Sequence, residues 1–224
     1  MQTMIQHIYM LPLFCSAICS CRAFGSKWPG LYRVFAALLL AVSFVEILAY
    51  LWAYWFSTFR NWPYSYSNLW LYNSFLIPQY LLYMTVYYKA IDNSKSRNII
   101  LVLAVIYTIF AIFNDIFLEG IHGVDSYTLA MADGIVLFMT ITWFNQVMKK
   151  KEIIKLATHP LVWISTGAFI FHAANLPYIL SLNFLVHNNI QLAVALFNIF
   201  LALNCVMYTF YTIAFLCQPH PRTS

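Results

Sequence analysis

The feature that most constrains this chain is a series of long apolar stretches separated by short polar segments. Each runs to about 20 residues, and an α-helix of that length crosses a bilayer hydrocarbon core of about 30 Å. Only 8% of the 224 residues are charged, against about 25% in a soluble domain, so the chain has too little charge to cover a water-facing surface. The sequence therefore predicts an all-α, polytopic membrane bundle and leaves no room for a sizeable soluble domain.

Seven such stretches follow one another, and polar, glycine or proline residues mark each break, as in SKWPG and DNSKSRN. The sequence thus predicts seven transmembrane helices in a single domain covering residues 1–224. The predicted spans are 3–21, 31–56, 67–89, 98–118, 127–148, 160–185 and 189–216.

The basic residues are distributed unevenly between the two sides that these spans define. One side has only Arg60, with Asp115, Glu119 and Asp125. Loops rich in Lys and Arg stay in the cytoplasm, so this asymmetry predicts an outside N-terminus, a cytoplasmic C-terminus and a multi-pass protein of the cytoplasmic (inner) membrane. Basic residues placed at span ends also argue against nucleic acid as a partner. The other side has eleven of the twelve basic residues: Arg22, Lys27, Arg33, Lys89, Lys95, Arg97, Lys149, Lys150, Lys151, Lys155 and Arg222.

The first span has an alternative interpretation as a cleaved signal peptide, which would leave six helices. Its positive residues follow the apolar segment instead of preceding it, which favours a retained helix. The five cysteines lie in or at the ends of apolar segments, and no cysteine–histidine set has the spacing of metal ligands. We therefore predict no disulfide framework, no metal site and no cofactor.

The third and seventh spans are similar to each other at an offset of 125 residues. LYNSFLIPQYLLYMT, from Leu71, aligns with LFNIFLALNCVMYTF, from Leu196, and Asn73 coincides with Asn198. The same offset carries the first span onto the fifth. The pattern predicts a 3+1+3 parallel repeat with halves 1–89 and 127–216 and a linker helix 98–118. Chance similarity between two Leu- and Phe-rich segments is the alternative.

This plan resembles the PQ-loop and SWEET sugar-transporter families in span count, orientation and repeat layout, and Pro78-Gln79 is a PQ pair. These families also place paired asparagines in the third and seventh helices, at the positions of Asn73 and Asn198. Their proline motifs belong to the first and fifth helices, whereas this PQ pair lies in the third span and has no partner in the seventh. The likeness is therefore one of architecture.

A second resemblance covers most of the chain. NLWLYNSFLIPQYLLY and HPLVWISTGAFIFHAANLPYIL are similar to segments of small seven-helix membrane proteins of Bacteroidota, most of them uncharacterised. This resemblance implies the fold and brings no activity with it.

Ionisable side chains inside a membrane span are costly and mark functional sites by default. Glu46, Asp133 and His172 lie inside the second, fifth and sixth spans. We predict that they and five amides line a ligand-binding site, with the bilayer and a small molecule as partners. Interhelical hydrogen bonding without a ligand is the alternative, above all for the amides. The five amides are Asn73, Gln79, Asn175, Asn198 and Asn204.

Four spans carry polar residues aligned at helical spacing. Lipid offers these groups no hydrogen-bond partner, so all four sets are predicted to face the bundle interior. The sets are Glu46 and Tyr50 on the second span, Asp133 and Thr140 on the fifth, Ser165, His172 and Asn175 on the sixth, and Gln191, Asn198 and Cys205 on the seventh.

The segment FIFHAANLPYIL, residues 169–180, concentrates this chemistry. Pro177 removes one helical hydrogen bond and predicts a kink just after His172 and Asn175. From positions along the helices, we predict that His172 and Glu46 share one polar cavity near the midplane. Proton exchange between the carboxyl and the imidazole would then couple the site to pH.

Three functions fit these features. The polar cluster favours a protein that binds a small solute, as a transporter or as a ligand sensor with a separate cytoplasmic signalling partner. An intramembrane lipid-modifying enzyme is less favoured, because no nucleophile-with-base motif, HExxH or phosphate loop occurs and no catalytic residue is indicated. The third function is that of a non-catalytic accessory subunit of a membrane complex.

Overall fold

The computed structural model describes residues 8–55, 67–149 and 156–217, and these residues are almost entirely helical. The all-α prediction is confirmed, because no strand occurs in these ranges. The α-helices are α2 (Met10–Ser20), α3 (Gly30–Tyr54), α4 (Leu69–Ala90), α5 (Ser94–Phe113), α6 (Ser126–Lys149), α7 (Pro160–Asn188) and α8 (Ile190–Leu216). Short 3₁₀ turns cover Cys21–Phe24 and Leu156–Thr158, and a π-helical turn, Asn114–Leu118, extends α5.

Four helical segments are long and apolar enough to cross a membrane: Gly30–Tyr54, Ser94–Leu118, Ser126–Lys149 and Ile190–Leu216. The chain therefore has the character of an integral membrane protein. Helix α2 is shorter, with 11 residues before its 3₁₀ turn. Helices α4 and α7 have 22 and 29 residues, and each contains an internal proline and several polar side chains.

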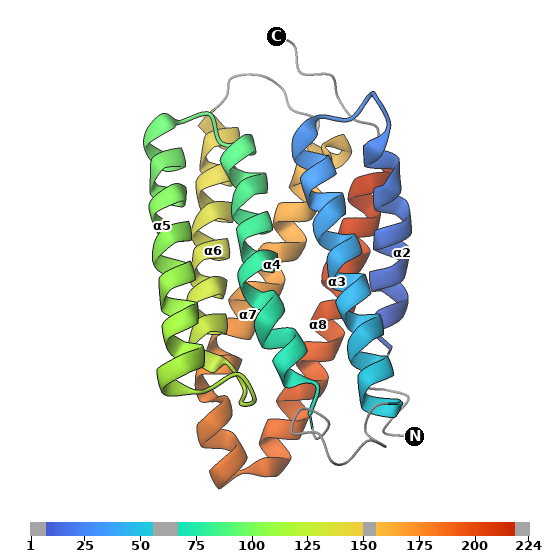
Figure 1. Ribbon diagram of the computed structural model, residues 1–224. Coiled ribbons are helices and arrows are strands. Elements are labelled where there is room, and N and C mark those ends of the chain that lie inside the picture. Colours follow the sequence, from blue (N-terminus) through green and yellow to red (C-terminus); the bar gives the residue numbers. More distant parts are fainter. Residues whose placement is uncertain (1–7, 56–66, 150–155, 218–224) are drawn as a thin grey trace.

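The helices form a ring with one helix outside it (Figure 1). Each helix packs against the next along the chain, and two further contacts, α4 with α6 and α2 with α8, close the circle. Helix α5 therefore lies outside a ring of six, against α4 and α6. Only Ile100, Tyr107 and Ala111 are buried on α5.

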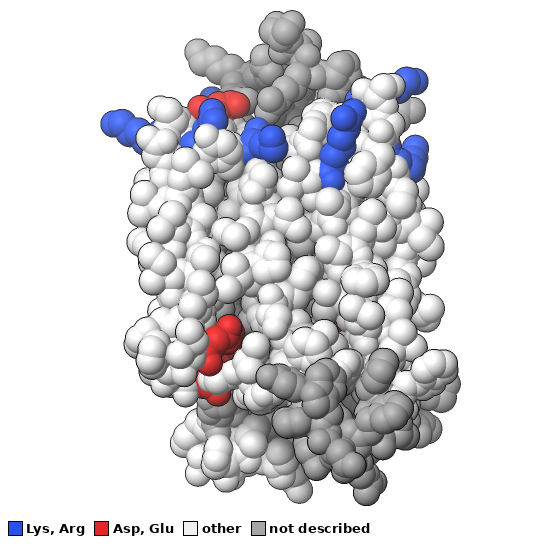
Figure 2. Space-filling view, viewed as in Figure 1, with Lys and Arg blue, Asp and Glu red and all other residues white. Residues whose placement is uncertain are grey.

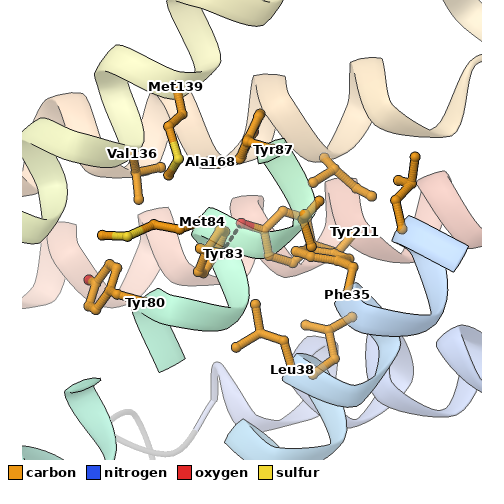
Figure 3. Packing of buried hydrophobic residues seen from close by; sticks show 14 of the residues in the cluster. Phe35, Leu38, Tyr80, Tyr83, Met84, Tyr87, Val136, Met139, Ala168 and Tyr211 are labelled. Atoms are coloured by element: carbon orange, nitrogen blue, oxygen red, sulfur yellow. Dashed lines mark hydrogen bonds between the residues drawn. The ribbon is translucent and has the colours of Figure 1, made fainter. Parts of the chain in front are cut away.

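Aromatic side chains fill the interior of this ring (Figure 3). The hydroxyls of Tyr83 on α4 and Tyr211 on α8 are 2.6 Å apart, so one donates a hydrogen bond to the other. Phe35 on α3 packs edge-on against both rings. A buried tyrosine needs a partner for its hydroxyl, and here tyrosines provide partners for one another across the ring.

Apart from the buried Glu46 and Asp133, the charged residues of the described part gather toward the two ends of the bundle, and the wall between them is largely apolar (Figure 2). Large apolar side chains such as Ile109 and Ile116 are more than 60% exposed on this wall. Lys and Arg lie at the end where α3 and α5 begin and α4 and α6 end. Asp115, Glu119 and Asp125 belong to the opposite end.

Some predicted features lie outside the described residues. They are the start of the first span, Arg60, Lys150, Lys151, Lys155 and Arg222.

Candidate functional site

A buried carboxylate on α6 joins two polar side chains of α7. Asp133 is fully buried, and its Oδ1 lies 2.6 Å from Nδ1 of His172. Its Oδ2 accepts a hydrogen bond of 2.7 Å from Nδ2 of Asn175. His172 and Asn175 are only 2% and 5% exposed, so the interior position predicted for the stripe on this helix is confirmed. We call these three residues the Asp133 cluster.

The packing of α6 on α7 explains this arrangement. The two α7 residues are three apart, so both side chains leave the same helix face, where one carboxylate reaches both. Asp133 is seven residues into α6, or about 10 Å from its first residue. Helix α7 continues through Pro177, whose missing N–H leaves the carbonyl of Ala173 without its usual helical donor.

Two atoms of the Asp133 cluster lack partners within the described part of the chain: Nε2 of His172 and Oδ1 of Asn175. Because an ionised Asp133 accepts from Nδ1–H, a neutral His172 presents a lone pair at Nε2. The amide oxygen of Asn175 is likewise an acceptor. A buried polar group without a partner costs about 1–3 kcal/mol, so the cluster can bind a group that supplies hydrogen-bond donors.

Aromatic rings form the surroundings of His172. The imidazole meets the rings of Tyr80, Tyr83 and Phe171 edge-on, with centroids 6.1, 5.9 and 5.1 Å away. Tyr107 of α5 packs against Tyr80, and its buried hydroxyl has no partner among the described residues. The cluster therefore combines apolar walls with a few polar groups, as small-molecule sites do.

Glu46 belongs to a separate group on the other side of the ring. Its Oε2 accepts hydrogen bonds from the hydroxyls of Tyr9, at 3.0 Å, and Tyr72, at 2.9 Å. The predicted pairing of Glu46 with His172 is not found, because Nδ1 of His172 bonds Asp133 and Nε2 bonds no described residue. Glu46 lies on α3, which packs against α2 and α4, whereas α7 packs against α6 and α8.

The remaining predicted residues do not join the Asp133 cluster. Asn73 is buried and donates to the carbonyls of Ile121 and Gly123, at 2.8 and 2.9 Å, so it fastens the segment before α6. Asn204 donates to the carbonyl of Phe200 within its own helix.

Gln79 is half-buried on α4, next to Pro78. Gln191 and Asn198 are exposed on α8, so the prediction that this stripe faces the interior is wrong for both. Helices α7 and α8 extend beyond the other helices at the end of the bundle where α8 begins (Figure 1). The first turns of α8 therefore lie beyond the ends of the other ring helices apart from α7. Asn73 and Asn198 thus have different surroundings.

Sequence reasoning missed several residues with a clear structural role. Tyr9 and Tyr72 hold Glu46, and Asn114 donates to Glu119, at 2.8 Å, and to Asp125. Burial raises the pKa of Asp125 to about 6, and the nearby charge of Asp115 adds to this effect. Polar residues near span ends were available as a signal for this group.

Two cavities in the described part of the chain lie away from the Asp133 cluster. One of about 460 Å³ is at the basic end, lined by residues of α3, α4 and α5, and one of about 270 Å³ lies between α4 and α5. The Asp133 cluster itself is closed to solvent, because its three side chains are at most 5% exposed. No group of three or more His, Cys, Asp or Glu side chains with metal-binding geometry occurs in the described ranges.

Comparison with known proteins returned no match to a family model, to a curated protein or to a solved structure.

Proposed function

We propose that the protein is a multi-pass membrane protein that binds a small polar solute at the Asp133 cluster, as a transporter or a ligand sensor. The observation that carries this proposal is the pair of unpartnered buried atoms, Nε2 of His172 and Oδ1 of Asn175. Both are acceptors when His172 is neutral, so the solute is one that presents hydrogen-bond donors such as hydroxyl or amino groups.

Burial of the whole cluster supports binding from within the bundle. A closed site admits a solute only when α7 moves relative to its neighbours, which is the kind of motion that both transport and ligand sensing use. One feature of α7 supports such motion. Pro177 breaks the hydrogen-bond pattern of the helix five residues after His172.

The proposed topology has all seven helices crossing the bilayer, with an outside N-terminus and a cytoplasmic C-terminus in the inner membrane. The gathering of Lys and Arg at one end of the bundle supports this orientation. A C-terminal fluorescent protein is then expected to mature and a C-terminal alkaline phosphatase to stay inactive. Phosphatase activity from the C-terminal fusion would overturn the orientation. A signalling partner, if the protein is a sensor, would bind this basic end.

The solute proposal is tested by a thermal-shift screen of small polyols, amines and amino acids on purified protein. Asn175→Leu removes the unpartnered acceptor, and Glu46→Gln alters the other buried carboxylate as the matched control. We expect compounds that stabilise the wild type and Glu46→Gln but not Asn175→Leu. Compounds that stabilise all three proteins equally would contradict binding at the cluster.

A second candidate, an intramembrane enzyme, is favoured by one observation. Asp133 holds Nδ1 of His172 and leaves Nε2 open, which is the arrangement of a general base oriented by a carboxylate. Mass spectrometry of each stabilising compound after incubation separates the two functions. A product formed by the wild type but not by His172→Gln would establish the enzyme, and unchanged compounds would favour binding alone.

A further inference from the structure

The larger cavity lies at the basic end, far from the Asp133 cluster, and the solute proposal leaves it unexplained. It has a volume of about 460 Å³ and is lined by the start of α3, the end of α4 and the first turn of α5. Lys89 and Arg97 contribute cationic side chains to its wall, and Tyr88 contributes an aromatic ring. In a membrane-inserted bundle this end lies at the level of the lipid headgroups.

Arg97 is held in a fixed position in the wall. Its guanidinium carbon lies 4.3 Å from the centroid of the Tyr88 ring, a cation–π contact. Its Nε is buried and has no acceptor within the described ranges. A guanidinium presents a planar set of donors that matches a phosphate group, so Arg97 can bind an anion in this cavity.

The start of α3 adds to the attraction for an anion. Pro29 precedes the helix and offers it no side-chain cap, whereas Asn93 caps α5 by accepting from the backbone N–H of Lys95 and Ser96. The first N–H groups of α3 therefore carry partial positive charge next to the cavity. Gly30 leaves space there, since an added Cβ would meet no atom within 4 Å.

One acidic residue also lines the cavity. Asp92 is bonded to Gln146, whose amide accepts from the backbone N–H of Asp92, at 2.7 Å, and donates to its carboxylate, at 3.2 Å. With Lys89 and Arg97, the lining side chains carry a net charge of one positive unit, which matches one phosphodiester.

A separate apolar groove lies farther along the same two helices, toward the middle of the bundle wall. The second cavity, of about 270 Å³, lies between α4 and α5 and is lined by Leu81 and Ala104, among others. Leu81 is seven residues before Tyr88, and Ala104 is seven residues after Arg97. Seven residues are two helical turns, so each pair shares a helix face and the groove lies about 10 Å deeper along both helices.

We propose that this surface binds a phospholipid, with the phosphate in the cavity beside Lys89 and Arg97 and an acyl chain in the groove between α4 and α5. The site uses none of the residues of the Asp133 cluster, so the lipid proposal and the solute proposal can be tested independently of each other. The occupant is a lipid because headgroup chemistry and chain chemistry follow one another along the same two helices.

The test uses the full chain, purified in a maltoside detergent free of phosphate, with bound phosphatidylglycerol counted by native mass spectrometry. We expect Arg97→Gln to weaken binding about tenfold, since a charge-assisted hydrogen bond is lost. Lys95→Gln, two residues away and exposed, makes the same charge change outside the cavity and should have less than about a twofold effect. Equal losses in both variants would overturn the site.

Two further variants and one control test the groove and the cavity separately. Ala104→Phe fills the groove and should reduce lipid retention, whereas Ile106→Phe, on an exposed position of α5, should not. Asp92→Asn removes the negative charge and should tighten binding. A thermal-unfolding assay with inorganic phosphate alone tests whether the cavity binds a free phosphate instead of a lipid headgroup. If phosphate stabilises the protein as strongly as phosphatidylglycerol does, the assignment to a phospholipid is overturned.

Discussion

Two carboxylates are buried at similar heights in the ring, Asp133 on α6 and Glu46 on α3. Asp133 is about 10 Å from the first residue of its helix, and Glu46 is about 12 Å from the last residue of its own, at the same end of the bundle. Among the described residues, the partners of Glu46 include two tyrosine hydroxyls, which donate to it from α4 and from Tyr9, just before α2. The partners of Asp133 are an imidazole and an amide, and each has a second polar atom that is left without a partner.

The difference separates a structural carboxylate from a carboxylate that organises a binding site. Tyr9 and Tyr72 use their single donor on Glu46, and this joins the segment before α2 to α3 and α4. His172 and Asn175 are two-ended side chains, so fixing one end on Asp133 fixes the direction of the other. The account therefore expects changes at Asp133 to affect both stability and solute binding, and changes at Glu46 to affect stability alone.

The largest expected effect is that of Asp133→Leu. This change leaves the donors of His172 and Asn175 buried without an acceptor, and we expect a loss of about 3 kcal/mol or more. The measurement is the shift of the thermal unfolding midpoint in detergent. Unfolding at the wild-type temperature would show that the cluster contributes nothing to stability and would remove the distinction between the two carboxylates.

Glu46→Gln should have a smaller effect. The amide oxygen of glutamine still accepts a hydrogen bond from a tyrosine hydroxyl, but this bond is weaker than one to a carboxylate. We therefore expect the free energy of unfolding to fall by about 1 kcal/mol. The same thermal assay measures it. The comparison fails if Glu46→Gln destabilises the protein more than Asp133→Leu does, because Glu46 would then be the more tightly coupled carboxylate.

Tyr72→Phe removes one tyrosine donor to Glu46 without leaving a cavity. We expect a loss of about 0.5–1.5 kcal/mol, and Tyr127→Phe, at an exposed ring on α6, serves as the control. A larger loss at Tyr127 would show that the Glu46 group does not stabilise the contact of α4 with α3.

The smallest effect concerns pH and lies outside both carboxylates. Because the pKa of Asp125 is raised to about 6, the folded protein binds a proton there that the unfolded chain releases at lower pH. Stability should therefore rise as the pH falls from about 7 through 6, and Asp125→Asn should abolish this part of the gain. The charge of the nearby Asp115 acts on Asp125, so the titration of Asp115 forms the background. An unchanged pH profile in Asp125→Asn would contradict the assignment.

The helical class and the buried polar face of α7 could be predicted because both depend on local sequence. Ser165, His172 and Asn175 share one face of α7 by simple helical spacing, and that face is buried. The wrong partner for His172 has a physical cause. Counting residues along a helix gives height but not the order of helices around the ring, and height alone does not distinguish Glu46 from Asp133.

The wrong expectation for Asn198, which was paired with Asn73, has a different origin. Both are asparagines inside predicted spans, but one is buried under the segment before α6 and the other is exposed on an extended part of α8. Their surroundings depend on how far neighbouring helices reach, which is a property of the packed bundle. Tyr9 and Tyr72 were missed for a related reason, since a tyrosine inside an apolar span is most often a packing residue.

The most direct test of the account is an experimental structure at a resolution that shows bound water and solute, determined with the protein in a lipid environment. The account predicts non-protein density within hydrogen-bond distance of both Nε2 of His172 and Oδ1 of Asn175, with Asp133 still bonded to the other end of each side chain. Side chains of the protein itself at both atoms would contradict the account, because no site for a solute would then remain.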